Sequence, residues 1–356
     1  RDAVQCIYTS GTTSRPKGVL VSHVALQIAL LSNSLATRQS YGEQAPVMLV
    51  VLPLFHTTAL YTLAMPVLGI GGTLVLSGPP FDPDAALDAI VKHGVTYLTM
   101  LPMMHQACVA IQAQRPRDLS GVRMAIYAMA PMPPALLDQV AAIYPNAAVI
   151  LGSGQTEVVP ATVMQWPQHQ LTAAASWGVS TPSVRTAIMA PSGELVPTGE
   201  TGEIVYRAPN VTTGYWNNPE ANASAYAHGW FHSGDIGTID TDGVVWFTDR
   251  LKDIIKTGGE NVSSVQVESI CMGAPGVAEC SIIGLPDEKW GESVCAVVVP
   301  DGSVPDDELA DSLIAYAKAH LAGFQVPKEV RIVPALPTTA TSKIQQHELR
   351  RQAREG

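Results

Sequence analysis

Apolar residues in the first half of the chain form short continuous runs that Gly and Pro separate. Residues 45–81 contain no Asp, Glu, Lys or Arg, but Pro and Gly divide them into pieces too short to cross a bilayer as one helix. Short apolar runs bounded by turn residues are typical of strands that are buried on both faces. We predict a strand over Val47–Leu52, a buried helix over Ala59–Leu68 and a strand over Thr73–Leu76, which together form a βαβ unit.

Strands and helices continue to alternate up to Leu151. Asp82 and Pro83 are start signals for a helix that ends at Gly94. The pattern then predicts strands over Val95–Thr99, Met124–Tyr127 and Ala148–Leu151 and helices over Met103–Gln114 and Pro133–Tyr144. This alternation predicts a mainly parallel sheet with helices on both faces and with ligands at the carboxyl ends of its strands.

The rest of the chain has two other patterns. Residues 176–248 are short β-rich pieces with many Gly and Pro turns, which predict a small β-barrel subdomain. Beyond a charged stretch at 248–253 the pattern predicts a compact α+β domain. Its elements are a hairpin turn at Gly258–Gly259, helices over Ser263–Met272 and Asp306–His320, and strands over Val277–Gly284, Ser293–Pro300 and Glu329–Val333.

The predicted fold class is therefore α/β, in two domains. The large domain covers residues 1–251, with the parallel sheet in 1–175 and the β-rich part in 176–251. A mobile α+β C-terminal domain covers 252–356, and a hinge joins the two.

Composition limits the partners and the compartment that we expect for this chain. With 356 residues, 47% hydrophobic and 15% charged, the chain can bury a large core. A net charge of −10 argues against nucleic acid as a partner, because backbone binding needs a basic stripe. The five cysteines are scattered, without Cys-x-x-Cys spacing, which favours a reduced cytoplasmic compartment. The chain begins without an initiator Met or a signal peptide, and we expect it to be a fragment.

Residues 8–18, YTSGTTSRPKG, place hydroxyl side chains around Gly11. The segment ends with Pro16, Lys17 and Gly18. Gly allows successive backbone N–H groups to converge on an anion, and Lys17 adds a mobile positive charge. This pattern predicts a phosphate-binding loop, with a flexible surface loop as the alternative. It is not a Walker loop, because Lys17 lies between Pro16 and Gly18. The candidate phosphate ligands are Thr9, Ser10, Gly11, Thr12, Thr13 and Lys17.

Two acidic residues stand out. Glu157 follows Thr156 just after the strand that ends at Leu151, and one carboxylate with one hydroxyl suffices for a nucleotide-bound Mg²⁺. A solvated loop acid is the alternative. Asp235, in GWFHSGD, can accept hydrogen bonds from both ribose hydroxyls, although Asp beside Gly234 is also a common turn former.

Together these segments resemble the adenylate-forming superfamily, in its branch of acyl-CoA synthetases that act on fatty or aryl acids. The match spans essentially all of this chain but lacks the family's N-terminal subdomain, so 1–251 would be part of the AMP-binding domain. The resemblance implies an acid–thiol ligase that uses ATP to convert a carboxylic acid to acyl-AMP and pyrophosphate, and then transfers the acyl group to CoA. It implies ATP, Mg²⁺ and CoA as cofactors and is compatible with a homodimer.

The resemblance also assigns roles to individual residues. Lys343 would be the catalytic lysine, Thr156 would contact the α-phosphate and Glu157 would bind Mg²⁺, with Lys252 at the hinge. The remaining assignments are Met129, Ala130, Pro131 and Ser153 at adenine, Asp235 and Arg250 at ribose and phosphate, Gly258 and Gly259 beside the pantetheine tunnel, and His56 and Gly154 at the acyl group.

Three serines depart from the family pattern: Ser14 and Ser342 replace Gly, and Ser153 replaces an aromatic residue. Two alternative functions stay open at this point. One is an amino-acid adenylation domain that loads a carrier protein, although no Asp that would hold an ammonium group is evident. The other is a nucleotide-binding fragment without activity.

Overall fold

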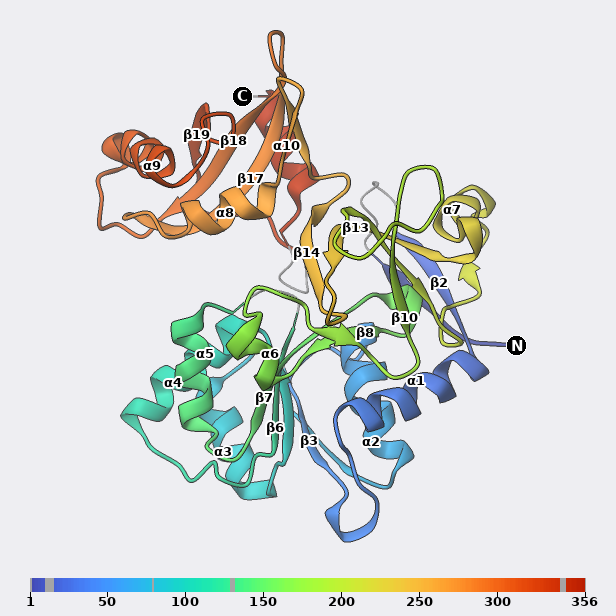
Figure 1. The fold of residues 1–356 in the computed structure, drawn as a ribbon. Helices are drawn as coiled ribbons and strands as arrows, with labels where there is room; N and C mark the ends of the chain where they lie inside the picture. Colours follow the sequence, from blue (N-terminus) through green and yellow to red (C-terminus); the bar gives the residue numbers. More distant parts are fainter. Residues whose placement is uncertain (1, 10–15, 79, 129–131, 340–343, 356) are drawn as a thin grey trace. The chain divides into compact units, whose positions relative to one another are not determined.

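The structure is a computed structural model, and it describes residues 2–9, 16–78, 80–128, 132–339 and 344–355 (Figure 1). Its contacts divide the chain into two compact units. The first comprises 1–233 and 237–247, and the second comprises 234–236 and 248–356. Two strands, β13 (Phe231–Ile239) and β14 (Val245–Arg250), contribute residues to both units. The predicted domain boundary at 251–252 and the roles given to the domains stay predictions.

A seven-stranded sheet forms the centre of the first unit. Its strands are β3 (Val47–Val50), β4 (Thr73–Leu76), β5 (Tyr97–Met100), β6 (Met124–Ala128), β7 (Ala148–Gly154), β8 (Ala161–Gln165) and β9 (Val179–Ser180). The order is β4-β3-β5-β6-β7-β8-β9. The first five strands are parallel, and β8 and β9 continue the sheet antiparallel. The predicted parallel sheet is therefore confirmed, with an antiparallel edge that the apolar pattern did not indicate.

Helices cover both faces of this sheet. The helices in this part of the chain are α1 (His23–Ala36), η1 (Gly42–Gln44), η2 (Thr58–Ala64), α2 (Met65–Gly69), α3 (Pro83–His93), α4 (Pro102–Gln114), α5 (Pro134–Ile143), η3 (Thr156–Val158) and α6 (Pro167–Thr172). Successive strand residues point to opposite faces, so Leu49 packs with α3, α4 and α5 while Met48 and Val50 pack with α1, η2 and α2. Figure 1 shows the two sets of helices on either side of the strands.

Local signals explain most element bounds. The Asp82 side chain accepts hydrogen bonds from Asp84 N and Ala85 N, and Gly94 ends α3 with a φ of 61°. Several predicted bounds need correction, and two of them lie close to the candidate site. The helix predicted over Ala59–Leu68 is the π-helix η2 followed by α2. Strand β7 runs beyond Leu151 to Gly154, because β8 pairs with its end.

Two smaller sheets complete the first unit. Strands β1 (Ala3–Thr9), β2 (Lys17–Ser22) and β12 (Gly214–Tyr215) form the order β1-β2-β12. In the β-rich region, β10 (Arg185–Met189) and β11 (Gly202–Arg207) join β13 and β14 in the order β10-β11-β13-β14. This region buries Ile204, Tyr206 and Phe231 in a core of its own. Its helices are α7 (Pro219–Ala225) and η4 (Ala227–Gly229).

The second unit is an α+β arrangement. Its elements are β15 (Ile255–Thr257), β16 (Glu260–Val262), α8 (Ser264–Cys271), β17 (Val277–Asp287), β18 (Gly291–Pro300), α9 (Asp306–His320), β19 (Glu329–Ile332) and α10 (Gln346–Glu355). The strand order is β16-β15-β18-β17, and β19 pairs parallel with β18. Residues of α8 and α9 pack on one face of the sheet, and Leu349 and Ala353 of α10 belong to a separate core that contains Ile283 and Leu285 of β17.

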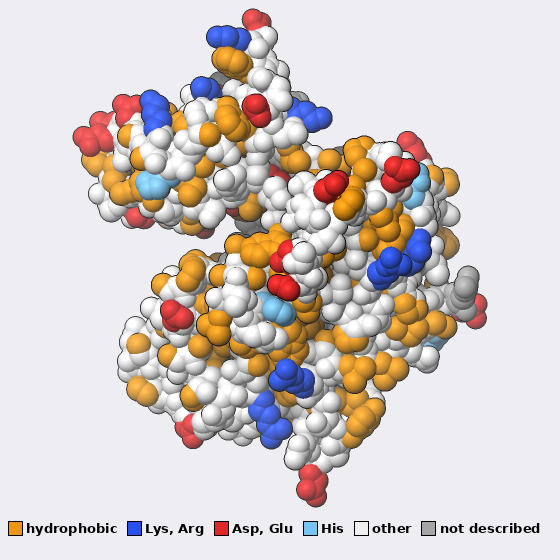
Figure 2. Space-filling model, viewed as in Figure 1, with side chains coloured by type: hydrophobic (Ala, Val, Ile, Leu, Met, Phe, Trp, Pro, Cys, Tyr) orange, Lys and Arg blue, Asp and Glu red, His pale blue; other side chains and the backbone are white. Residues whose placement is uncertain are grey.

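Surface composition follows from the low charge content. On the face shown in Figure 2, acidic and basic side chains form small separate groups among apolar and uncharged ones. Within the described ranges, none of the helices has the length and apolar character that a bilayer crossing requires.

Candidate active site

The predicted phosphate loop joins two paired strands. Thr9 ends β1, Lys17 begins β2, and the two residues lie opposite each other in the antiparallel pair. The Thr9 hydroxyl donates to the Lys17 carbonyl at 3.5 Å. The other predicted phosphate ligands, namely Ser10, Gly11, Thr12 and Thr13, lie outside the described residues.

Backbone pairing places Tyr215 beside this hairpin. Strand β12 pairs antiparallel with β2, with Tyr215 opposite Val19, and Trp216 N donates to Gly18 O at 2.7 Å. The ammonium Nζ of Lys17 lies 4.9 Å from the centroid of the Tyr215 ring, within the range of a cation–π contact. The Tyr215 ring therefore forms one wall beside the lysine that the sequence assigns to phosphate.

The predicted metal ligand reaches the same tyrosine. Glu157 and Thr156 lie on the short helix η3, where the Glu157 carbonyl accepts from Thr212 N at 2.8 Å. The Tyr215 hydroxyl donates to Glu157 Oε1 at 2.7 Å. Burial, together with the neighbouring Glu157, raises the pKa of Tyr215, so its hydroxyl stays protonated and remains a donor. Residues 17, 157 and 215, far apart in sequence, thus meet in one cluster.

This cluster fits a nucleotide-bound magnesium ion better than a metal held by protein alone. Mg²⁺ takes oxygen ligands and uses one or two carboxylates together with substrate phosphates. Glu157 is half-buried and Thr156 is 8% exposed, and both supply oxygen atoms. Among the described residues there is no group of three or more His, Cys, Asp or Glu side chains that could hold a metal ion. The donor set therefore suits a hard ion that brings its own phosphate ligands.

The predicted adenine and acyl residues have structural roles that are visible without a ligand. Ser153 is half-buried at the end of β7, and its carbonyl accepts from the Thr162 hydroxyl at 3.3 Å. A Cβ at Gly154 would lie 1.9 Å from the Pro160 carbonyl oxygen, so only Gly fits there. His56 is half-buried before η2, and its Nδ1 accepts from Thr58 N at 3.3 Å. Met129, Ala130 and Pro131 lie outside the described residues.

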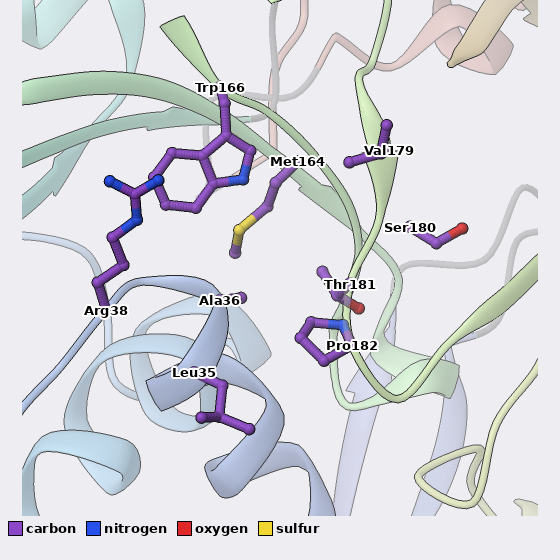
Figure 3. A pocket seen from close by; sticks show the side chains of 9 residues that line it. All are labelled: Leu35, Ala36, Arg38, Met164, Trp166, Val179, Ser180, Thr181 and Pro182. Atoms are coloured by element: carbon purple, nitrogen blue, oxygen red, sulfur yellow. The ribbon is translucent and has the colours of Figure 1, made fainter. Parts of the chain in front are cut away.

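The first unit also has a pocket of about 300 Å³ near the end of α1. Figure 3 shows Arg38 beside the Trp166 ring, with Thr181 and Pro182 across the space from them. The Arg38 guanidinium carbon lies 4.3 Å from the Trp166 ring centroid. The pocket is lined by Leu35, Ala36, Arg38, Met164, Trp166, Val179, Ser180, Thr181 and Pro182. None of these is a residue that the sequence assigns to nucleotide or acid.

The predicted ribose ligands pair with each other in the second unit. The Asp235 side chain is 3% exposed, and its Oδ1 lies 3.1 Å from Nε of Arg250. Asp235 comes directly after Gly234, whose φ is 73° and whose carbonyl accepts from Leu251 N at 2.8 Å. This arrangement holds the carboxylate in place before any ligand binds.

The predicted hinge residue Lys252 is itself exposed, but it lies between two buried acidic residues, Asp249 and Asp253. Asp249 is fully buried, and its carboxylate accepts from the Ser264 hydroxyl at 3.2 Å. Asp253 is 5% exposed and binds both Lys252, at 3.4 Å, and Arg350 of α10, at 2.9 Å. Desolvation lowers the pKa of Lys252, which the Asp253 charge partly offsets.

The two glycines assigned to the pantetheine tunnel form the turn between β15 and β16. Gly258 has a φ of 60° and Gly259 a φ of 88°, as a two-residue type I′ hairpin turn requires. A Cβ at Gly258 would also lie 2.9 Å from the Trp290 ring. The predicted catalytic residue Lys343 lies outside the described residues.

Sequence reasoning missed Tyr215 as a site residue. The available signal was its place in the Gly-Tyr-Trp-Asn-Asn-Pro-Glu segment, but a tyrosine in a two-residue strand has no chemical role that sequence alone can assign. Its contacts with Lys17 and Glu157 depend on pairing between β12 and β2.

Comparison with known proteins shows which family the chain belongs to. The family model described as AMP-binding enzyme matches residues 1–216, and that of the AMP-binding enzyme C-terminal domain matches residues 266–343. The chain is 42% identical over 351 residues to a feruloyl-CoA synthase of an Amycolatopsis species, covering 98% of this chain and 70% of the relative. It is 35% identical to the long-chain-fatty-acid–CoA ligase FadD13 of Mycobacterium tuberculosis, covering 99% of this chain and 68% of the relative.

Solved structures give the same result. The ATP-bound MatB of Rhodopseudomonas palustris superposes with a TM-score of 0.87 at 31% identity, covering 99% of this chain and 69% of that one. The o-succinylbenzoate-CoA synthetase of Bacillus subtilis, in complex with ATP and magnesium, gives a TM-score of 0.87 at 29% identity. The match covers 98% of this chain and 70% of that one. The chain belongs to the family of AMP-binding enzymes, in the CoA-ligase branch of the adenylate-forming superfamily.

Proposed function

We propose that this protein is an ATP-dependent acid–thiol ligase that converts a fatty or aromatic carboxylic acid to its CoA thioester through an acyl adenylate. The observation that carries the proposal is the meeting of Lys17 and Glu157 on Tyr215. These residues come from separate motifs that the sequence assigns to phosphate and to metal, and the fold brings them into one cluster. Relatives named as feruloyl-CoA and long-chain-fatty-acid–CoA ligases support both substrate classes.

In the first half-reaction, an oxygen of the substrate carboxylate bonds to the α-phosphorus of ATP and the bond to pyrophosphate breaks. Two anions must approach each other, so the residues have to offset their repulsion. Lys17 would bind the β- and γ-phosphates, Asp235 would accept hydrogen bonds from the ribose, and Lys343 would neutralise charge where carboxylate meets phosphate. Mg²⁺, held by Glu157 and Thr156, would supply a further positive charge to the phosphates.

In the second half-reaction, the CoA thiol gives up its proton, its sulfur bonds to the acyl carbon and AMP leaves. We propose that a backbone change at Lys252 separates the two half-reactions and that the Gly258–Gly259 turn serves the second one. A cytoplasmic location and a homodimer belong to the same proposal.

The test is ATP–pyrophosphate exchange with a panel of fatty, aromatic and amino acids, followed by thioester detection after CoA is added. We expect exchange with a fatty or aromatic acid and thioester formation with CoA. Exchange with amino acids alone, without CoA transfer, would support the carrier-loading alternative. ATP binding without any exchange would support an inactive nucleotide-binding fragment.

Lys343→Ala separates the half-reactions in the same assay. We expect it to abolish exchange while thioester formation from supplied acyl-AMP continues, because its charge is needed only where carboxylate meets phosphate. Lys318→Ala, which removes an exposed lysine on α9, is the matched control. Equal loss of both half-reactions would contradict the role of Lys343.

A further inference from the structure

Tyr215 contacts two candidate ligands of the nucleotide through two different parts of its side chain. Its hydroxyl donates to Glu157 Oε1 at 2.7 Å, and its ring lies 4.9 Å from Lys17 Nζ. A hydrogen bond to a carboxylate and a cation–π contact are both directional, so together they restrict both side chains. The sequence gives Tyr215 no role, and the mechanism above does not use it.

The backbone of Tyr215 is itself held on both sides. Tyr215 N donates to Asn222 Oδ1 at 2.7 Å, and Asn222 Nδ2 donates back to Tyr215 O at 3.0 Å. Pairing with β2 fixes the other edge of β12, and the residue is 8% exposed. A side chain anchored in this way loses little further freedom when a ligand binds, which makes it a suitable support for mobile ligating groups.

We propose that Tyr215 is a positioning residue that holds the Glu157 carboxylate and the Lys17 ammonium ready for the magnesium-bound triphosphate. The Tyr215 hydroxyl donates its hydrogen bond to Oε1 of Glu157, so Oε2 is the candidate metal ligand. The ring holds the lysine ammonium on the same tyrosine. This inference rests on the proposed function, because it takes Glu157 and Lys17 as ligands of magnesium and ATP.

The test is a binding measurement on the full chain. Calorimetric titrations with ATP at increasing MgCl₂, and with AMP, compare the wild type with Tyr215→Phe, which keeps the ring and removes the hydroxyl. We expect about five- to tenfold weaker ATP binding and a higher MgCl₂ requirement, since one hydrogen bond to a charged group is lost. AMP binding should stay unchanged, because AMP lacks the phosphates that Lys17 would contact.

Tyr226→Phe is the matched control. The Tyr226 ring lies 6.3 Å from that of Tyr215, and its hydroxyl bonds to Thr212 Oγ1 at 2.9 Å instead of to Glu157. It therefore removes a neighbouring phenol without touching the carboxylate, and we expect the MgCl₂ dependence to stay that of the wild type. An equal change in both variants would show a general packing effect and would overturn the proposal.

A double-mutant cycle decides whether the hydroxyl acts through the carboxylate. Tyr215→Phe combined with Glu157→Gln should cost no more ATP affinity than Glu157→Gln alone, whereas fully additive losses would overturn the proposal. Tyr215→Leu combined with Lys17→Met tests the contact between the ring and the ammonium in the same way. If Glu157→Gln removes the magnesium dependence and Tyr215→Phe changes nothing, the inference fails and the proposed function stands. If wild-type ATP binding does not depend on magnesium, the inference fails, whereas the exchange assay still decides the proposed function.

Discussion

The buried carboxyl of Glu268 on α8 leads to a prediction of how the free energy of unfolding depends on pH. Its carboxylate accepts from Ile282 N at 3.4 Å and faces Asp249 and Asp253. Burial first, and then the two acidic neighbours, raise the pKa of Glu268 from 4.5 to about 7. In the unfolded chain the same carboxyl ionises near its ordinary pKa. Between these two values the folded state binds more protons, so the free energy of unfolding falls as pH rises.

The change Glu268→Gln removes this penalty. From the two pKa values, ionisation of Glu268 costs the folded state about 1 kcal/mol at pH 5 and about 3 kcal/mol at pH 8. We therefore expect Glu268→Gln to stabilise the second unit by about 2 to 3 kcal/mol more at pH 8 than at pH 5. The difference between the two pH values is the quantity to measure, because constant effects of the amide cancel in it.

Hydrogen exchange in peptides that cover α8 and β17, measured in increasing urea at both pH values, reports the stability of this unit. Glu279→Gln, on the same unit but exposed on β17, is the control and should show no such difference. If Glu268→Gln shifts stability equally at pH 5 and pH 8, the carboxyl is already ionised at pH 5 and the reasoning from burial is wrong.

Two further predictions concern other buried groups. His105 of α4 is fully buried, its Nε2 lies 3.3 Å from Ile126 O, and burial lowers its pKa to about 4. As pH falls below about 6.5, this histidine takes up a proton in the unfolded chain before it does so in the folded one. The free energy of unfolding of the first unit should therefore fall by about 2 kcal/mol between neutral pH and pH 5. In His105→Gln, urea unfolding at the two pH values should show a smaller fall in the free energy of unfolding. For Asp235→Asn we expect AMP to bind about ten- to hundredfold more weakly, because a charge-assisted acceptor for ribose is lost. Unchanged affinity by calorimetry would make Asp235 only a partner of Arg250.

The sequence predicted the fold class because the buried strands and helices each carry a local signal. Helix α9 begins and ends where its pattern and acidic first turn indicate, at Asp306 and His320. Bounds that depend on neighbouring strands were less accurate. The strand predicted over Val95–Thr99 is found at Tyr97–Met100, because pairing with β3 and β6 decides which residues join the sheet. The extension of β7 to Gly154 has the same origin.

The candidate site could be predicted only one motif at a time. Lys17, Glu157 and Asp235 each follow from residue type and local context, but no local pattern says that Lys17 and Glu157 share a neighbour. Tyr215 joins them because a two-residue strand pairs with the strand after the phosphate loop, which is a long-range contact. Residues that support ligands are therefore harder to predict from sequence than the ligands themselves, since their chemistry alone does not mark them.

The predicted hinge region is a further case in which the environment changes the meaning of a sequence pattern. A charged stretch at a domain boundary suggests side chains in water, yet the carboxylate of Asp253 is buried and paired with Arg350. Removing one partner of a buried pair is costly, because it leaves the other charge without compensation. A backbone change at Lys252 must therefore either break the pair or move α10 together with it. Because α10 begins at Gln346, just after Lys343 in the sequence, motion at the predicted hinge would carry the predicted catalytic lysine with it.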